Sequence, residues 1–123
     1  MPDVYVYVVA SALEHLYTHL DEENGLAATL AFFIAPPLGK KPEHIKVRLV
    51  PVVVAEAVRD VHIVVVTTAG ARTPADIAHD CSETAEALFL AWSRFAKSFP
   101  SDTIKTVDGE VLMPQGVWKP LMG

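Results

Sequence analysis

The most apolar stretch of the chain runs from residue 44 to residue 70 and contains two β-branched runs. Residues of this type favour strands. In the first run, 45–54, apolar and basic residues alternate, which predicts a strand with one solvated face. Pro51 interrupts this strand, so it is expected to be bulged or to lie at a sheet edge there. The second run, 58–68, is apolar at nearly every position and predicts an inner strand. The short link between them predicts an antiparallel hairpin.

A long helix is predicted over residues 74–98. Thr73 is a suitable N-cap, Pro74 fits the first helical position, and Asp76 places a carboxylate in the first turn. Acidic residues in the first half and basic residues near the end complement the helix dipole. The apolar stripe at helical spacing is formed by Ile77, Cys81, Leu88, Trp92, Phe95 and Phe99.

Residues 3–21 satisfy two patterns at once. Their β-branched and aromatic residues favour a strand, but apolar positions also recur at spacings of three and four. Pro2 suits the first turn of a helix, so we expect a helix over about 3–21. The next apolar run, 26–35, is expected to be a strand that stops at Pro36, because proline cannot donate to a sheet.

After the long helix, residues 103–113 are expected to form a small hairpin that turns at Asp108-Gly109. Residues 114–123 combine prolines and glycines with large apolar residues, and either fold back over the core or form an arm that docks on another subunit. The expected fold is α+β, in one domain over 1–113 with the arm following. Its sheet is mostly antiparallel, with about four to five strands, and is packed by the N-terminal helix and the helix near 74–98.

Composition limits the classes of function. The 123 residues suffice for one domain, and half of them are hydrophobic, which favours an oligomer. The formal charge of −5 disfavours a broad nucleic-acid-binding surface. One cysteine excludes an internal disulfide, no apolar run spans a membrane, and the N-terminal stretch lacks the basic residues of a secretory signal. We therefore expect synthesis in the cytoplasm.

The histidines and the single cysteine are the candidate residues for metal binding or nucleophilic chemistry. His15 and His19 lie four apart and could bind zinc from one helical face, but no convincing third ligand follows. Cys81 falls on the apolar stripe, where a cysteine usually acts as a small hydrophobe, although His62 on the sheet could face it. The loop 67–74 lacks the glycines and lysine of a phosphate loop. We therefore expect no catalytic residue, no metal and no cofactor.

One ordered pattern resembles a known family. The strand 60–66 leads through residues 71–76 into the long helix, after a leading helix and before a small C-terminal hairpin. This resembles the tail terminator and tail-completion proteins of long-tailed bacteriophages. The resemblance implies a non-enzymatic structural virion protein, made in the host cytoplasm, whose hexameric ring ends the tail tube and joins the tail to the head or neck.

The same resemblance implies particular partners. They are further copies of the chain in the ring, the tail tube protein, and the head or neck connector. DNA would pass through the lumen without specific binding, which suits an acidic protein. The residues expected at these interfaces are Lys40, Lys41, Lys46, Arg48, Trp118, Leu121 and Met122.

Two alternatives come from other classes. One is a small-molecule-binding or enzymatic α+β domain, which predicts that polar groups such as His62, Thr68 and Cys81 converge on a pocket. The other is an adaptor module that binds a partner through an exposed strand edge.

Overall fold

Two strand–helix–strand units build the protein, shown by a computed structural model that describes residues 2–52, 59–67, 73–113 and 116–118. The first comprises β1 (Asp3–Val9), α1 (Ala10–Thr18), α2 (Leu26–Leu38), the 3-10 turn η1 (Pro42–His44) and β2 (Lys46–Val52). The second comprises β3 (Val61–Val66), α3 (Pro74–Ser98) and β4 (Val107–Met113), which β5 (Gly116–Trp118) follows.

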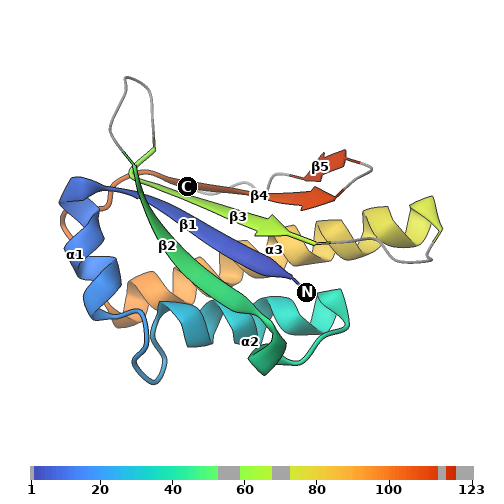
Figure 1. Ribbon diagram of the computed structural model, residues 1–123, viewed down its shortest axis with the longest axis horizontal. Helices are drawn as coiled ribbons and strands as arrows, with labels where there is room; N and C mark the ends of the chain where they lie inside the picture. The colour runs from blue at the N-terminus through green and yellow to red at the C-terminus, as the bar shows by residue number, and fades with distance from the viewer. Residues whose placement is uncertain (1, 53–58, 68–72, 114–115, 119–123) are drawn as a thin grey trace.

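The five strands form one sheet in the order β2-β1-β3-β4-β5 (Figure 1). Within each unit the two strands are parallel, and parallel strands need a long crossover, which the helices provide. The two units meet where β1 pairs antiparallel with β3, and β4 pairs antiparallel with β5. The sheet is therefore mixed, with two parallel and two antiparallel pairs.

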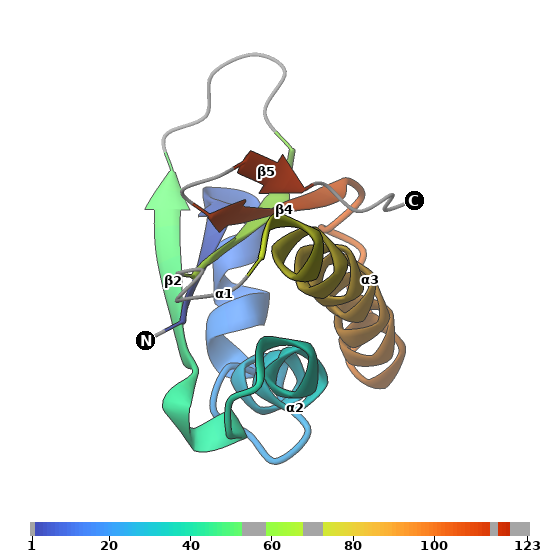
Figure 2. The same cartoon turned by 90° about the vertical axis from the view of Figure 1, so that its right-hand side faces the viewer.

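The helices lie on one side of this sheet (Figure 2). Strand β1 shows the consequence clearly, because Val4, Val6 and Val8 are fully buried while Tyr5 and Tyr7 between them are only half-buried. Alternate residues of a strand point to opposite faces, so the valines face the helices and the tyrosines face away. The other face of the sheet, which we call the uncovered face, has no helix over it among the described residues.

The helix expected over about 3–21 forms only in its second half. Residues Asp3–Val9 are a strand, and only Ala10–Thr18 continue as a helix. The helical spacing across 3–21 was a coincidence of two elements joined without a loop. The β-branched residues of β1 gave the better signal, because this strand lies between two others and needs side chains that pack on a pleated sheet.

The strand expected over 26–35 is wrong, because Leu26–Leu38 form a helix with Pro36 and Pro37 inside it. Its buried positions recur every three to four residues, from Leu26 through Leu30 and Ile34 to Leu38. Both prolines lie in the final turn, so only the end of the helix loses the hydrogen bonds that their missing N–H groups would have donated. Gly39 then ends the helix at a φ of 68°, and its N–H donates to the Pro36 carbonyl at 3.0 Å.

Neither expected hairpin forms. The strands of the central stretch, β2 and β3, exist as predicted but do not pair, because β1 lies between them. The second expected turn, Asp108-Gly109, lies inside β4, where Ile63 pairs with Gly109 and His62 with Asp108. Pairing along the whole of β3 holds this dipeptide extended, so its turn preference is overridden.

The long helix is confirmed at both ends. Thr73 caps it as expected, and its Oγ1 accepts a hydrogen bond from the Asp76 backbone N–H at 3.2 Å. The α+β class is also confirmed, although the sheet is mixed. Of the expected arm over 114–123, residues 116–118 form β5, and the division into a domain and an arm stays a prediction. No helix in the described part of the chain is both long and apolar enough to cross a membrane.

Candidate functional site

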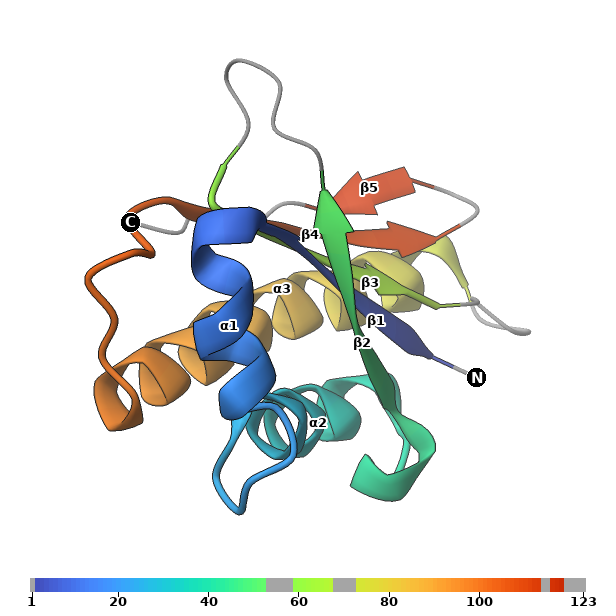
Figure 3. The same cartoon turned by 60° about the vertical axis from the view of Figure 1, so that its left-hand side comes forward.

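Pro2 directly precedes β1 and is buried. The N-terminus lies at this end of the sheet (Figure 3). The register pairs the next residue, Asp3, with Lys46 on one side and with Val66 on the other. Continued by one position, this register places Pro2 between Ile45 and Thr67, both of which are buried. The start of the first strand therefore lies between buried residues of both units.

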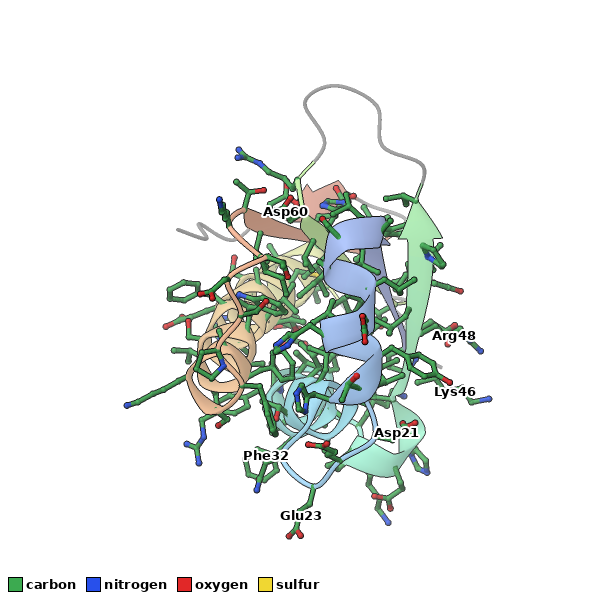
Figure 4. The ribbon with its side chains drawn as sticks, turned by 90° about the vertical axis from the view of Figure 1, so that its left-hand side faces the viewer. Asp21, Glu23, Phe32, Lys46, Arg48 and Asp60 are labelled. Atoms are coloured by element: carbon green, nitrogen blue, oxygen red, sulfur yellow. The ribbon has the colours of Figure 1, made fainter. Side chains whose placement is uncertain are left out.

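Two cations lie beside this end of the sheet. Lys46 and Arg48 project from β2, away from the helices (Figure 4). An Arg48 Nη1 donates to Asp3 Oδ1 at 3.0 Å, and its guanidinium carbon lies 5.8 Å from the centre of the Tyr5 ring. Both cations are exposed, so they remain available to an anionic ligand that approaches the uncovered face.

A second polar group of residues lies across the middle of the uncovered face. Tyr7, His62 and Asp108 are aligned on three adjacent strands. The His62 ring contacts two carboxylates at once, with Nδ1 2.5 Å from Asp108 Oδ1 and Nε2 3.1 Å from Glu110 Oε1. Arg59 reaches the same site, with Nε 3.9 Å from Asp108 Oδ2. We call His62, Asp108 and Glu110 the imidazole clamp.

The imidazole clamp favours a protonated ring. Burial alone would lower the pKa of His62, but the hydrogen bonds and charges of Asp108 and Glu110 outweigh it and raise that pKa above 6.5. Both ring nitrogens are occupied by carboxylates, so neither is open to a substrate. The arrangement holds a positive charge in place and is poorly suited to act as a general base.

The candidate residues for metal binding or nucleophilic chemistry do not come together in one site among the described residues. His15 Nε2 lies 2.9 Å from the Phe99 carbonyl, and His19 Nδ1 lies 3.0 Å from Glu22 Oε2. No group of three or more metal-ligating side chains occurs among the described residues. Cys81 is buried among the core side chains beneath the sheet, whereas His62 lies on the uncovered face. The expected convergence of His62 and Cys81 is therefore absent, and Thr68 lies outside the described residues.

The residues predicted at interfaces are spread over the molecule. Lys40 and Lys41 are exposed between α2 and η1, and Lys46 and Arg48 lie on the edge strand β2. Trp118 ends β5, at the opposite edge of the sheet. Leu121 and Met122 lie outside the described residues. The structure thus brings together one pair, Lys46 and Arg48, and leaves their role in an interface a prediction.

The sequence interpretation missed three residues that matter here. The local pattern places Pro2 at the start of a helix, and it places Asp108 and Glu110 in a turn and its flank. The signal that could have found the carboxylates is their spacing of two, which places both on one face of a strand once 107–113 is recognised as continuous. For Pro2 the signal was the alternation directly after it, which marks the strand that it precedes.

A hollow of about 360 Å³ also lies on the helical side, between α2 and α3. Arg94 is its one cation, and no cluster of titratable groups converges there. Its lining residues are Glu23, Asn24, Ala28, Thr29, Phe32, Phe33 and Arg94. It therefore offers less chemistry than the end of the sheet at Pro2.

Comparisons with known proteins identify the fold. No family model and no curated protein sequence matches the chain. Among solved structures, a fused 4-OT described as a symmetric trimer is 20% identical, covers 90% of this chain and 82% of its own, and has a TM-score of 0.51. Native Ps01740 is 11% identical, and the match covers 90% of this chain and 92% of that protein, with a TM-score of 0.53. Macrophage migration inhibitory factor from Toxoplasma gondii is 16% identical with 91% and 90% covered, but its TM-score of 0.41 supports no argument.

These neighbours have the fold of 4-oxalocrotonate tautomerase (4-OT), so the resemblance to phage tail terminators is wrong. The hexameric tail ring, the tail tube and connector partners, the DNA-filled lumen and the virion location lose their basis with it. The expectation that the protein is not an enzyme is also contradicted, because a solved structure with this fold is named for 4-OT. The alternative of an enzymatic α+β domain fits better.

Proposed function

We propose that this protein is a tautomerase-type enzyme that moves a proton within a small anionic substrate at the end of the sheet marked by Pro2. The observation that carries the proposal is a buried proline at the start of β1, beside two exposed cations, in a fold shared with a protein named for 4-OT. Tautomerisation removes a proton from one atom and returns it to another. Such an enzyme needs an acid–base group that titrates near neutral pH.

The group proposed for this step is the nitrogen of Pro2, after removal of Met1. Within the chain this nitrogen is an amide and has no basicity, but cleavage of the preceding bond converts it into a secondary amine. An α-amino group in a model peptide titrates at about 7.7–8.0, and burial favours its neutral, basic form. The enclosed position of Pro2 between two strands therefore suits a base that takes up and releases a proton near pH 7.

The cations give the proposed substrate its class. The name 4-oxalocrotonate describes a keto acid that carries carboxylates, and Lys46 and Arg48 are the basic side chains nearest to Pro2 on β2. Arg48 is oriented by its contact with Asp3, so its remaining donors are fixed in direction. We therefore propose that α-keto acids and their enols are bound through their carboxylates by these two residues.

We also propose that the protein is a homo-oligomer assembled through the uncovered face. A fold neighbour is described as a trimer, and the uncovered face presents the half-buried rings of Tyr5 and Tyr7 beside the partly exposed Val66. Aromatic side chains in this setting are common at subunit interfaces. Lys46 and Arg48 at the β2 edge would then lie close to the boundary between subunits, which keeps them as proposed interface residues.

Conversion between the enol and keto forms of 4-oxalocrotonate or phenylpyruvate, followed by ultraviolet absorbance, tests the proposed activity. Intact mass of the purified protein must first show whether Met1 has been removed. We expect activity from the processed form and a loss of at least about a hundredfold when an extra residue precedes Pro2, because acid–base groups contribute about 10²–10⁴-fold.

The matched control is Pro51→Ala, which alters an exposed proline of β2 and is expected to retain activity. Full activity in protein whose Pro2 remains acylated by a preceding residue would contradict the proposed role of Pro2. Absence of activity toward both keto acids in processed protein would contradict the substrate class.

A further inference from the structure

We infer that protonation of His62 controls the association of this chain with a second copy of itself through the uncovered face. The inference rests on the homo-oligomer proposed above and adds a condition on which assembly depends. It stands on the geometry of the imidazole clamp, in which one histidine on β3 holds two carboxylates of β4.

The clamp occupies a central position on the surface that a second copy would cover. His62 lies on β3, with β1 on one side and β4 on the other. Its side chain is 31% exposed and that of Glu110 is 20% exposed, so both still contact water in the separate chain. Assembly through this face would remove that water, and charge–charge interactions strengthen as water leaves.

The charge of the clamp depends on one proton. With His62 protonated, one positive and two negative charges leave a net charge of −1, and without the proton the net charge is −2. A carboxylate that is buried without a partner destabilises the buried state strongly. Since assembly would bury the clamp, the protonated form is the one that a second copy can cover at least cost.

Other groups around the ring do not replace the lost proton. Tyr7 on β1 faces His62 with a ring centre 6.2 Å away. Arg59 contacts Asp108 at 3.9 Å, but its side chain is exposed and it has no ion pair with Glu110 in the described part of the chain. Deprotonation therefore leaves Glu110 without the one ion-pair partner that the structure gives it, and this residue carries the pH dependence.

The direction follows from linkage. Assembly is favoured by the protonated clamp, so protons are taken up when copies associate, and association weakens as the pH rises through the pKa of His62. That pKa lies above 6.5 because Asp108 and Glu110 outweigh the effect of burial. We expect the association constant to fall by about tenfold per pH unit for each His62 that must be protonated.

Sedimentation velocity of the full chain from pH 5.5 to 8.5, at one salt concentration and several protein concentrations, tests this. We expect larger assemblies at the acidic end and smaller species at the alkaline end. Glu110→Gln removes the carboxylate that loses its ion-pair partner when His62 is deprotonated. This variant is expected to assemble equally from pH 5.5 to 8.5. His79→Gln is the control, because His79 pairs with Glu83 on the exposed surface of α3. This variant should keep the pH dependence of assembly seen in the wild type.

The outcomes separate the two proposals. If assembly does not change with pH while an NMR titration shows that His62 changes its protonation, control by His62 is wrong. The proposed oligomer is then unaffected. A folded monomer at every pH, with a circular dichroism spectrum that is unchanged, overturns the oligomer and this inference together. The activity of Pro2 is measured independently of both.

Discussion

His62 and Asp108 lie directly opposite each other on β3 and β4, with Nδ1 and Oδ1 2.5 Å apart, so a single proton links the two strands. The raised pKa of His62 means that this link contributes stability fully below about pH 6.5, the ordinary histidine value, and loses it as the pH rises through the raised pKa. Thermal unfolding of dilute protein should therefore show a falling Tm across that window. His62→Gln should flatten the profile.

The expected size of this effect is modest. A hydrogen bond to a charged group contributes about 1.5–3 kcal/mol, and partial exposure screens it, so we expect about 0.5–1 kcal/mol. Asp108→Asn keeps the shape of the side chain and removes its charge, and it should give the same flattening. A Tm that stays constant between pH 6 and 8.5 in the wild type would contradict the link.

Asp60 provides the opposite pH dependence. Its Oδ2 accepts hydrogen bonds from the backbone N–H groups of Lys105 at 2.8 Å and Thr106 at 3.2 Å, and these lower the pKa of Asp60 below 3.8. A lowered pKa contributes stability above the unfolded value that is lost as the pH falls through the folded value. Asp60→Asn should lower the Tm at pH 7, and the difference from wild type should shrink below about pH 4. A difference that is constant down to pH 2.5 would show that the charge is not responsible.

How much could be predicted from the sequence is clearest at Thr73 and at Asp108. The capped helix α3 was predicted to its first residue, because the N-cap, the proline and the apolar stripe are all local signals that agree. Asp108-Gly109 is an equally strong local signal for a turn, and it failed because pairing with β3 outweighs it. Local patterns are reliable where no distant strand competes for the same backbone.

The candidate site depends on contacts that no local pattern contains. His62 meets Asp108 and Glu110 across 46 and 48 residues, and Asp3 meets Arg48 across 45. The two contacts of His62 exist because β4 pairs in parallel with β3, and the contact of Asp3 exists because β1 pairs in parallel with β2. A helix over 3–21 excludes only the contact of Asp3 with Arg48, whereas a turn at Asp108-Gly109 excludes the pairing of β4 with β3 that brings His62 to its two carboxylates.

The N-cap of α3 can be tested with a pair of substitutions. Thr73→Ala removes the side-chain oxygen that accepts from the Asp76 N–H, and should lower the free energy of unfolding by about 1 kcal/mol. Thr73→Ser keeps a hydroxyl and should lower the free energy of unfolding by a few tenths of a kcal/mol at most. Urea unfolding at pH 7 measures both, and equal losses in the two variants would show that the methyl group, rather than the cap, is responsible.

Two phenylalanines on neighbouring helices test which surface of the helical layer is core. Phe95 on α3 is 1% exposed and packs against Trp92 and Phe99, whereas Phe32 on α2 is 68% exposed and projects outward (Figure 4). Phe95→Ala should lower the free energy of unfolding by about 3–5 kcal/mol, because it removes buried area and leaves a cavity. Phe32→Ala should change it by less than about 0.5 kcal/mol in dilute monomer. Urea unfolding of both variants at pH 7 measures the difference, and a loss at Phe32 approaching that at Phe95 would mean that Phe32 is covered in solution, contrary to its exposed position here.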